Sequence, residues 1–465
     1  FLPDSVTWIT VRGGWLYEKS RNTERQRNAV YDGDPYAFSR HPLDQAFATE
    51  NLADADGAPT SRSLYRTTTW KEAMNANASL GVRRLLPKKG QLNVGASVSF
   101  TDRTSDVLAE RDLRFRYDPE ANELRYETDH RPEQSLKTSA DARYQVWLGK
   151  KLLLKMGYEF THSRDNDRQQ HSVTDAAAAP NADEEGETTD PNSYRRRQTS
   201  DRHDATLAAT LNLGPVSLMP QVQVQHRSEH LTYVRGVLDV DRQRYENLWQ
   251  PQMTMRWKVK RGQSVEADYS LRTDLPDLLE TVPYVDDINP LFVSQGNPLL
   301  RRTHRHSAGL RYFANITKQQ RVFSLSLNYD RRLHPLSAMY FYNEQTGAYR
   351  RMMANTGSGT EWNGRVSYEQ AAGDYVRLQN ILKAGHQRSH GFLTADYDAA
   401  TAAPNLRKCF FIEDSPTISF EQDKLLLKLG ASYRFNRLRY APQAASNQSL
   451  TDYGFEFTAR YKWKI

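Results

Sequence analysis

The C-terminal stretch of the chain sets the strongest constraint on its fold. From Tyr453 to Ile465 seven apolar or aromatic residues occupy every second position, and polar or charged residues and one glycine stand between them. A period of two places these two sets on opposite faces of a β-strand. The length of the pattern matches the roughly 9–11 residues that a tilted strand needs to cross a bilayer. The stretch therefore predicts a strand with one lipid-facing side.

The same alternation recurs in pairs of segments that flank short turns. The first such turn is 87–91, and further turns are predicted at 149–151, 214–215, 261–263, 315–319, 372–374 and 422–424. With one strand near 5–17 and the last strand of the chain, we expect about sixteen to eighteen strands. The positions expected to face lipid include Leu92, Val94, Ala96, Val98, Leu425, Leu427, Leu429, Phe455 and Phe457.

The connections on the other side of these hairpins are long and polar. Examples are 18–63, 105–134, 228–244 and 164–198, and the last of these holds AAAAPNADEEGETTDPN and is expected to be a flexible extracellular loop. Short turns on one side and long loops on the other are typical of bacterial outer-membrane barrels. A propeller would bury both faces of its sheets, and a sandwich would have similar loops at both ends. The sequence predicts an all-β, transmembrane antiparallel barrel in the bacterial outer membrane, with 1–465 as its barrel domain.

Composition agrees with this prediction and excludes several other classes. Hydrophobic residues make up only 38% of the chain, but a barrel needs apolar residues on one face of each strand alone. Cys409 is the only cysteine, which excludes an intrachain disulfide. The net charge of +7 is spread along the chain without a nucleic-acid motif, so we expect membrane lipids and no nucleic acid as partners.

No catalytic or cofactor motif emerges from the sequence. Gly357-Ser358-Gly359 lacks the third glycine of a dinucleotide-binding turn, and Gly-x-Ser-x-Gly and His-Glu-x-x-His patterns do not occur. His304 and His306 share one strand face, where interfacial histidines near the rim are the favoured interpretation. We expect no enzyme activity, no cofactor and no metal site.

Three short segments carry a resemblance to a known family. Asp287-Ile288-Asn289-Pro290-Leu291-Phe292 is followed by Gln295-Gly296-Asn297-Pro298-Leu299-Leu300, and Ala354-Asn355-Thr356-Gly357 precedes a later strand. These segments resemble a Bacteroidetes outer-membrane β-barrel family whose members are similar to the barrels of TonB-dependent, SusC-like transporters. The chain departs from the family at Arg302, where a proline is common.

The resemblance implies uptake of a solute through a plugged barrel of about 22 strands. It implies that the plug and the first strands are missing from this sequence, and that TonB and a surface lipoprotein are partners. The alternative function is a structural or interaction subunit of an outer-membrane assembly with lipoprotein partners. Asn289, Pro290, Gly296, Asn297 and Pro298 suit a loop that folds back over the barrel mouth, because proline and glycine end strand pairing.

The polar face of the strands is expected to line the lumen. It carries more basic than acidic residues among the positions that the alternation assigns, and a wall of this sign attracts anions. Arg256, Arg305, Arg311 and Arg365 are the candidates for contact with a ligand or a plug. Arginine suits this role because its guanidinium can grip a carboxylate or phosphate through two parallel hydrogen bonds.

Overall fold

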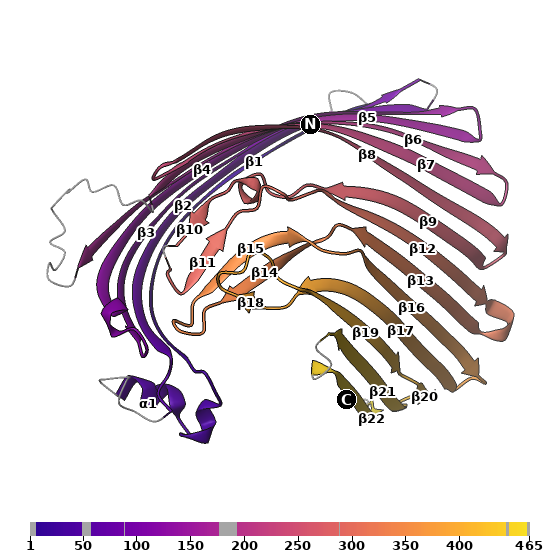
Figure 1. Ribbon diagram of the computed structural model, residues 1–465. Coiled ribbons are helices and arrows are strands. Elements are labelled where there is room, and N and C mark those ends of the chain that lie inside the picture. Colours follow the sequence, from indigo (N-terminus) through magenta and orange to yellow (C-terminus); the bar gives the residue numbers. More distant parts are fainter. Residues whose placement is uncertain are drawn as a thin grey trace.

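The computed structural model describes residues 6–48, 57–87, 89–175, 193–287, 289–442 and 446–462. Most of these residues form one curled antiparallel sheet of seventeen strands (Figure 1). The strands are β1 (Thr7–Val30), β2 (Ser61–Leu86), β3 (Gly90–Phe115), β4 (Glu123–Leu148), β5 (Leu152–Asp175), β6 (Tyr194–Leu213), β7 (Val216–Arg235), β8 (Leu238–Lys260), β9 (Gln263–Asp274), β12 (Thr303–Ile316), β13 (Arg321–Leu333), β16 (Gly359–Ala372), β17 (Val376–Phe392), β19 (Pro404–Asp414), β20 (Thr417–Gln422), β21 (Leu425–Ala441) and β22 (Gln448–Tyr461).

Neighbours in the sheet follow chain order, as in an up-and-down barrel wall. β19 and β20 both pair with β17 and with β21, so the seventeen strands occupy sixteen positions. Pro416 separates the two pieces, because proline has no N–H to donate to the ladder. The all-β antiparallel prediction and its strand count are therefore confirmed. β1 and β22 are the two edges of the sheet among the described residues.

The seven short turns lie at one end of the sheet, where the sequence predicts them. At four of them a glycine adopts a positive φ of 68° to 77°, which residues with a Cβ rarely adopt: Gly149, Gly214, Gly262 and Gly373. No helix among the described residues is long and apolar enough to cross a membrane. The α-helix α1 (Pro42–Ala48) and the single-turn helices 35–37, 119–121, 279–281 and 317–319 all lie in connections.

Several strands extend further at the opposite end than the alternation predicts. β5 runs to Asp175 and β6 begins at Tyr194, so both enter the segment 164–198 that was expected to be a loop. Residues 176–192 of that segment lie outside the described residues. The extension is held by polar cross-strand contacts such as Arg131 with Asp167, which need no apolar face. The expected loop 228–244 is instead a two-residue turn between β7 and β8.

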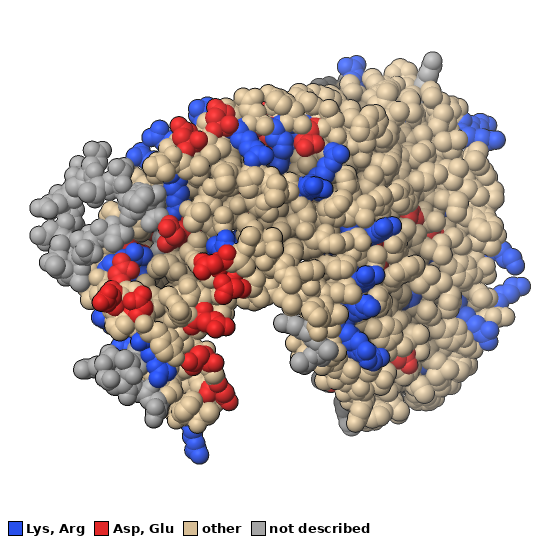
Figure 2. Space-filling view, in the orientation of Figure 1, with Lys and Arg blue, Asp and Glu red and all other residues tan. Residues whose placement is uncertain are grey.

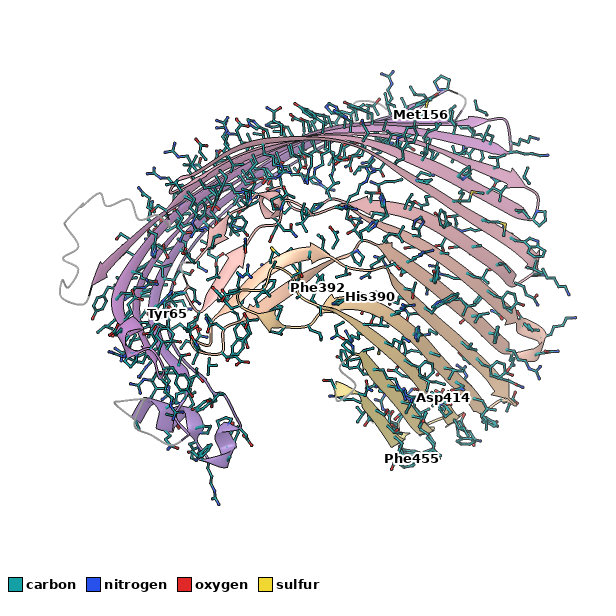
Figure 3. The ribbon with its side chains drawn as sticks, viewed as in Figure 1. Tyr65, Met156, His390, Phe392, Asp414 and Phe455 are labelled. Carbon is teal, nitrogen blue, oxygen red and sulfur yellow. The ribbon has the colours of Figure 1, made fainter. Side chains whose placement is uncertain are left out.

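The apolar side of the sheet faces outward. Phe455 and Met156 project from the convex side, far apart along the sheet (Figure 3). Phe455 is 83% exposed and Phe457 is 69% exposed, which would be costly in water for side chains of this size. A lipid environment removes that cost, and the other positions predicted to face lipid share this face by strand register.

A second, smaller sheet lies on the concave side of the large one (Figure 1). Its five strands are β10 (Val285–Asp286), β11 (Phe292–Gln295), β15 (Tyr349–Asn355), β14 (Leu336–Tyr342) and β18 (Ala395–Asp396), in that order. They come from three successive connections at the long-loop end. We call this five-stranded unit the loop sheet. It is mixed, because the β11–β15 and β14–β18 pairs are parallel.

Candidate lumenal site and loop sheet

Three of the four predicted lumenal arginines lie in one row across the concave face. Arg256 on β8 stands opposite Glu266 on β9, which stands opposite Arg311 on β12. From Arg311 the row continues through a serine to Arg365 on β16 and on to the C-terminal edge. The complete row is Arg256, Glu266, Arg311, Ser326, Arg365, Lys383, Glu413, Arg434 and Asp452. We call it the inner row.

Carboxylates in the inner row bridge cations on the strands at either side. Glu266 accepts from Arg256 Nε at 2.6 Å and from Arg311 Nη1 at 2.8 Å. Glu413 lies 3.1 Å from Lys383 Nζ and 3.0 Å from Arg434 Nε. With five cations and three carboxylates, the row keeps a surplus of positive charge. That surplus favours an anion in front of it.

Arg365 is the exception within the inner row. Its side chain is exposed, and no hydrogen bond or ion pair joins it to another residue in the part of the chain that the structure describes. Its cross-strand neighbours are Ser326, which can donate a hydrogen bond, and Lys383, which is also cationic. The guanidinium is thus available to a ligand without first giving up a carboxylate.

Arg305 does not join the row. It lies on β12 six residues from Arg311, nearer the long-loop end, and its Nε donates to Asp330 at 2.9 Å. Ser307 donates to the same carboxylate oxygen. The contacts tie β12 to β13, so the structure places Arg305 in a cross-strand brace away from the other three arginines.

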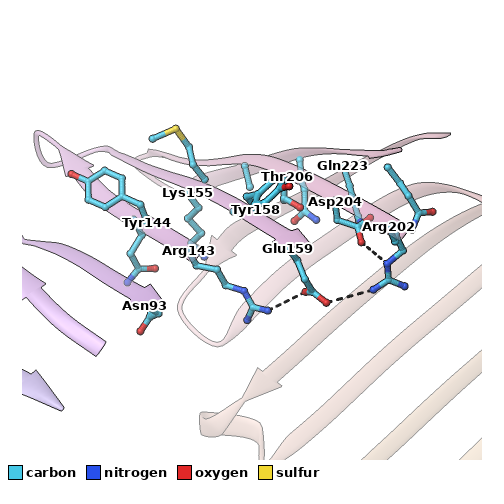
Figure 4. A pocket seen from close by; sticks show the side chains of 16 residues that line it. Asn93, Arg143, Tyr144, Lys155, Tyr158, Glu159, Arg202, Asp204, Thr206 and Gln223 are labelled. Carbon is cyan, nitrogen blue, oxygen red and sulfur yellow. Dashed lines mark hydrogen bonds and ion pairs between the residues drawn. The ribbon is translucent and has the colours of Figure 1, made fainter. Parts of the chain in front are cut away.

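A hollow of about 450 Å³ lies on the concave face of β3 to β7, well before the inner row in the sequence (Figure 4). Glu159 at its centre lies 3.5 Å from both Arg143 and Arg202. Arg202 also lies 2.7 Å from Asp204, which accepts from Gln223 at 3.0 Å. Here too a carboxylate bridges cations from the strands on either side, which largely neutralises the wall.

The candidate residues from the sequence omit Arg143 and Arg202 from this hollow. Both follow the period-two alternation of their strands, because Arg143 is two residues from Asp141 and Arg202 is two from Asp204. That signal is present in the sequence. The alternation does not determine the register in which neighbouring strands pair, and this register places Arg143 and Arg202 next to Glu159.

The motif loop 275–302 packs inside the wall and joins the loop sheet. Leu278 and Val282 are fully buried against Leu231 and Tyr233 of β7. Gly296 has no room for a side chain, because a Cβ there would collide with the carbonyl oxygen of Val282. The close approach allows the Gly296 amide to donate to the Tyr284 carbonyl at 3.0 Å.

The predicted motif residues sit in the turns of this loop. The Asn289 side chain accepts from the Leu291 amide at 3.1 Å, across Pro290. The Asn297 side chain accepts from the Leu299 amide at 2.9 Å, across Pro298, and donates to the Met353 carbonyl at 2.8 Å. Asn297 therefore connects its turn to β15 in another loop.

Arg350 on β15 connects all three loops of the loop sheet. Its guanidinium donates to Gln295 Oε1 at 2.9 Å and to the carbonyls of Tyr397 and Ala399 at 2.8 Å each. It also lies over the ring of Phe341, 4.2 Å from the centroid. Phe341 is fully buried with Met339 and Ala354 in the core of the unit. The loop sheet is therefore a packed body with its own small core.

In the part of the chain that the structure describes, no group of three His, Cys, Asp or Glu side chains is arranged to hold a metal ion. His304 and His306 lie on the convex face near the long-loop end and contact Thr273 and Tyr269, each at 2.9 Å. Cys409 is a free thiol of intermediate exposure.

Comparisons with known proteins give one family and a set of distant structural likenesses. A family model described as "Outer membrane protein beta-barrel family" matches residues 228–461, about half of the chain. No curated protein matches by sequence. Among solved structures, the chain is similar to the hemophore receptor HasR of Serratia marcescens in complex with its hemophore HasA and heme. The identity is 10% and the TM-score is 0.40, over 97% of this chain and 80% of that one.

Two further structures are similar at the same level. The ferric enterobactin receptor PfeA of Pseudomonas aeruginosa shares 10% identity with a TM-score of 0.36, over 98% of this chain and 80% of that one. The FrpB iron transporter of Neisseria meningitidis shares 8% identity with a TM-score of 0.36, over 99% of this chain and 82% of that one. TM-scores this low do not bear on function.

Proposed function

The chain belongs to the outer membrane protein beta-barrel family, and we propose that it is the wall of an uptake barrel whose inner row binds an anionic solute. The protein lies in the bacterial outer membrane, where a lumen with fixed charges on its wall can select solutes by sign. The proposal is for binding and transport rather than catalysis. The functional class that we propose is that of the TonB-dependent receptors, because the motif loop resembles a family whose members are similar to the barrels of those receptors.

The observation that carries the proposal is the position of Arg365. It stands in a row with Arg311 and Lys383, exposed to the lumen and without an ion pair among the described residues. Free guanidinium groups bind carboxylates and phosphates through paired, charge-assisted hydrogen bonds. Ser326 beside it adds a neutral donor at the same level. An anion with two or more carboxylates or phosphates fits such a row.

The same arginines have a competing role as contacts to a domain that fills the lumen. In that case their charges would meet carboxylates of the plug rather than a solute. TonB and a surface lipoprotein are further proposed partners, and both rest on the resemblance of the motif loop. The alternative function, a structural subunit of an outer-membrane assembly, would use these contacts for docking alone.

The test replaces Arg256, Arg305, Arg311 and Arg365 together with glutamine and measures binding of citrate to the full chain in detergent at low salt. We expect weaker citrate binding than in the unmodified protein, and no change for uncharged sucrose. Because exposed charges are screened by ions, the difference should shrink as salt is added. The matched control is Arg305→Gln alone, since Arg305 lies outside the inner row and should leave citrate binding unchanged.

Two results would contradict the anion site. Unchanged citrate affinity in the folded quadruple variant would leave only the structural role for these residues. A variant that loses thermal stability yet keeps its solute preference would favour contact with a plug or partner domain.

A further inference from the structure

A second cationic row lies on the opposite, convex face of the sheet. Arg331 on β13 pairs with Thr360 on β16, which pairs with Arg388 on β17. Arg388 pairs with Lys408 on β19, and Lys408 pairs with Arg439 on β21. We call this the outer row. Its four charged side chains are all exposed and all positive.

Strand alternation fixes the face to which the outer row belongs. Arg439 lies six residues from Tyr433 on β21, on the same face, and Tyr433 pairs with Tyr453, two residues before the outward-facing Phe455. The outer row is therefore on the lipid-facing side, as is its neighbour His306, which pairs with Arg331.

Along the membrane normal, the outer row lies at the level of the membrane surface. Arg331 lies ten residues beyond Arg321, where β13 leaves its short turn. Ten residues of strand span about 33 Å, or roughly 25 Å along the membrane normal at a tilt of about 40°. This equals the approximate height of the apolar band of an outer-membrane barrel. The outer row thus stands at the headgroup level of the outer leaflet.

An aromatic belt, interrupted on β17 by His386, lies directly below the outer row. One outward position nearer the short turns, β13, β16 and β19 carry Tyr329, Trp362 and Phe410. The rings of Tyr329 and Trp362 are 4.6 Å apart, and Trp362 is 55% exposed. Aromatic residues concentrate where acyl chains meet headgroups. A molecule bound here would meet cations at one end and apolar side chains at the other.

Within the described part of the chain, the cations of the outer row have no partner of opposite charge. No ion pair or hydrogen bond found between described residues includes the charged groups of Arg331, Arg388, Lys408 or Arg439. Three of these cations lie on β17, β19 and β21. On the inner face the same three strands carry Lys383, Glu413 and Arg434, where a glutamate separates the cations. On the outer face three cations are direct cross-strand neighbours. Like charges in direct opposition destabilise a sheet unless an anion lies between them.

We propose that the outer row binds the phosphate group of a lipid in the outer leaflet. Arg388, Lys408 and Arg439 lie on adjacent strands about 5 Å apart, so one phosphate can contact all three. Arg437, exposed one outward position below Arg439, can contact the glycosidic or ester oxygens next to that phosphate. The belt of Phe410 and Trp362 receives the acyl chains. Figure 2 shows more Lys and Arg than Asp and Glu over the later strands at the right of the view, including the short-turn end.

A lipid fits the outer row better than a soluble anion does. A free phosphate would use the cations alone and would leave the exposed aromatic belt without a function. A phosphorylated lipid satisfies both, because its headgroup and its chains are separated in the same direction as the cations and the belt. The site does not depend on the proposed solute-binding role of the inner row, since the two rows face opposite sides of the sheet.

The test compares the full chain with a triple variant, Arg388→Gln with Lys408→Gln and Arg439→Gln, by native mass spectrometry from detergent. The probes are lipid A with both phosphates, dephosphorylated lipid A, and inorganic phosphate. We expect the unmodified protein to bind phosphorylated lipid A about tenfold or more tightly than the triple variant does. The matched control is Lys383→Gln with Arg434→Gln, which neutralises the inner face of the same strands and should leave lipid binding unchanged.

Three outcomes would overturn the inference. Equal lipid A binding by the triple variant would remove the role of the outer row. Equal binding of dephosphorylated lipid A would show that the phosphate is not recognised. Competition by inorganic phosphate at the concentration of the lipid would assign the site to soluble anions. If the triple variant does not fold, Lys408→Gln alone is compared in the same way, with a smaller loss expected and unchanged binding again contradicting the site.

Discussion

Glu413 and Lys408 lie five residues apart on β19 and therefore face opposite sides of the sheet. Glu413 contacts Lys383 and Arg434 inside the barrel, whereas Lys408 stands between Arg388 and Arg439 outside it. On its lumenal side β19 thus places the Glu413 carboxylate between two cations. On its lipid side it places a cation, Lys408, between two further cations. The two faces of the wall are built for different surroundings, a wet lumen and an anionic membrane surface.

Removing the bridging carboxylate should strengthen anion binding inside the barrel. In Glu413→Gln, Lys383 and Arg434 lose their shared partner, so the surplus charge of the inner row rises by one. Lys383 and Arg434 are 44% and 55% exposed and Glu413 is 25% exposed, so water screens these ion pairs and we expect a stability cost of about 1 kcal/mol. Citrate affinity at low salt, measured by calorimetry, should increase. Glu456→Gln, on β22 outside the row, is the control, and a decrease in citrate affinity of Glu413→Gln would contradict the arrangement.

Placing a charge on the lipid face should destabilise the protein in proportion to its depth. Phe457 is outward and 69% exposed, so Phe457→Arg would bring a guanidinium into the apolar band. We expect a cost of about 2–4 kcal/mol if the position is near the bilayer midplane, and less near an interface. Denaturant unfolding in lipid vesicles measures the change. Thr458→Arg faces the lumen and should cost much less, and equal costs would mean that Phe457 does not contact lipid.

The loop sheet should depend on the absence of a side chain at residue 296. In Gly296→Ala the new methyl group would collide with the Val282 carbonyl, so the motif loop must leave the inner wall. We expect amides of β11 and β15 to lose hydrogen-exchange protection while the strands of the large sheet keep theirs. Gly391→Ala is the control, because its nearest neighbour would be Ser337 Oγ at 3.8 Å, an ordinary contact. Equal protection in both variants would contradict the packing seen here.

The membrane-spanning part of this fold could be predicted from the sequence because lipid imposes a period of two on every strand. Phe455 and Phe457 follow that rule, and the turn glycines are needed for their positive φ. The outer ends of β5 and β6 could not be found in this way. There both faces of the strand meet water, so polar pairs such as Arg131 with Asp167 replace the alternation.

The inner row shows where sequence reasoning about the site stops. Alternation places Arg256, Arg305, Arg311 and Arg365 on the same face, but it says nothing of their height on the wall. Height depends on the register of each strand pair, and a shift of two residues in one pair would move Arg365 out of the row while keeping its face. The loop sheet was equally hidden, because its strands pair across three loops and two are only two residues long.

Docking of the motif loop should weaken as pH rises, through Glu280. Burial raises the pKa of this carboxyl above its ordinary value of 4.5; the nearby Arg351 opposes that shift, and Asp277 reinforces it. A carboxyl with a raised pKa binds its proton more tightly in the docked loop than in the released one. Docking is therefore most favourable at pH values below 4.5, where both states are protonated, and it loses free energy as pH rises from 4.5 through the raised pKa.

The amide of Asn297 reports this equilibrium, because it donates to the Glu280 carbonyl at 2.7 Å in the docked loop. We expect its hydrogen-exchange protection, corrected for the intrinsic rate, to fall between pH 4.5 and pH 8. In Glu280→Gln the side chain does not titrate, so protection should be nearly constant over that range. Tyr284 in the same loop has its pKa raised to about 12 by burial and does not titrate there. A pH dependence that persists in Glu280→Gln would assign the proton to another group.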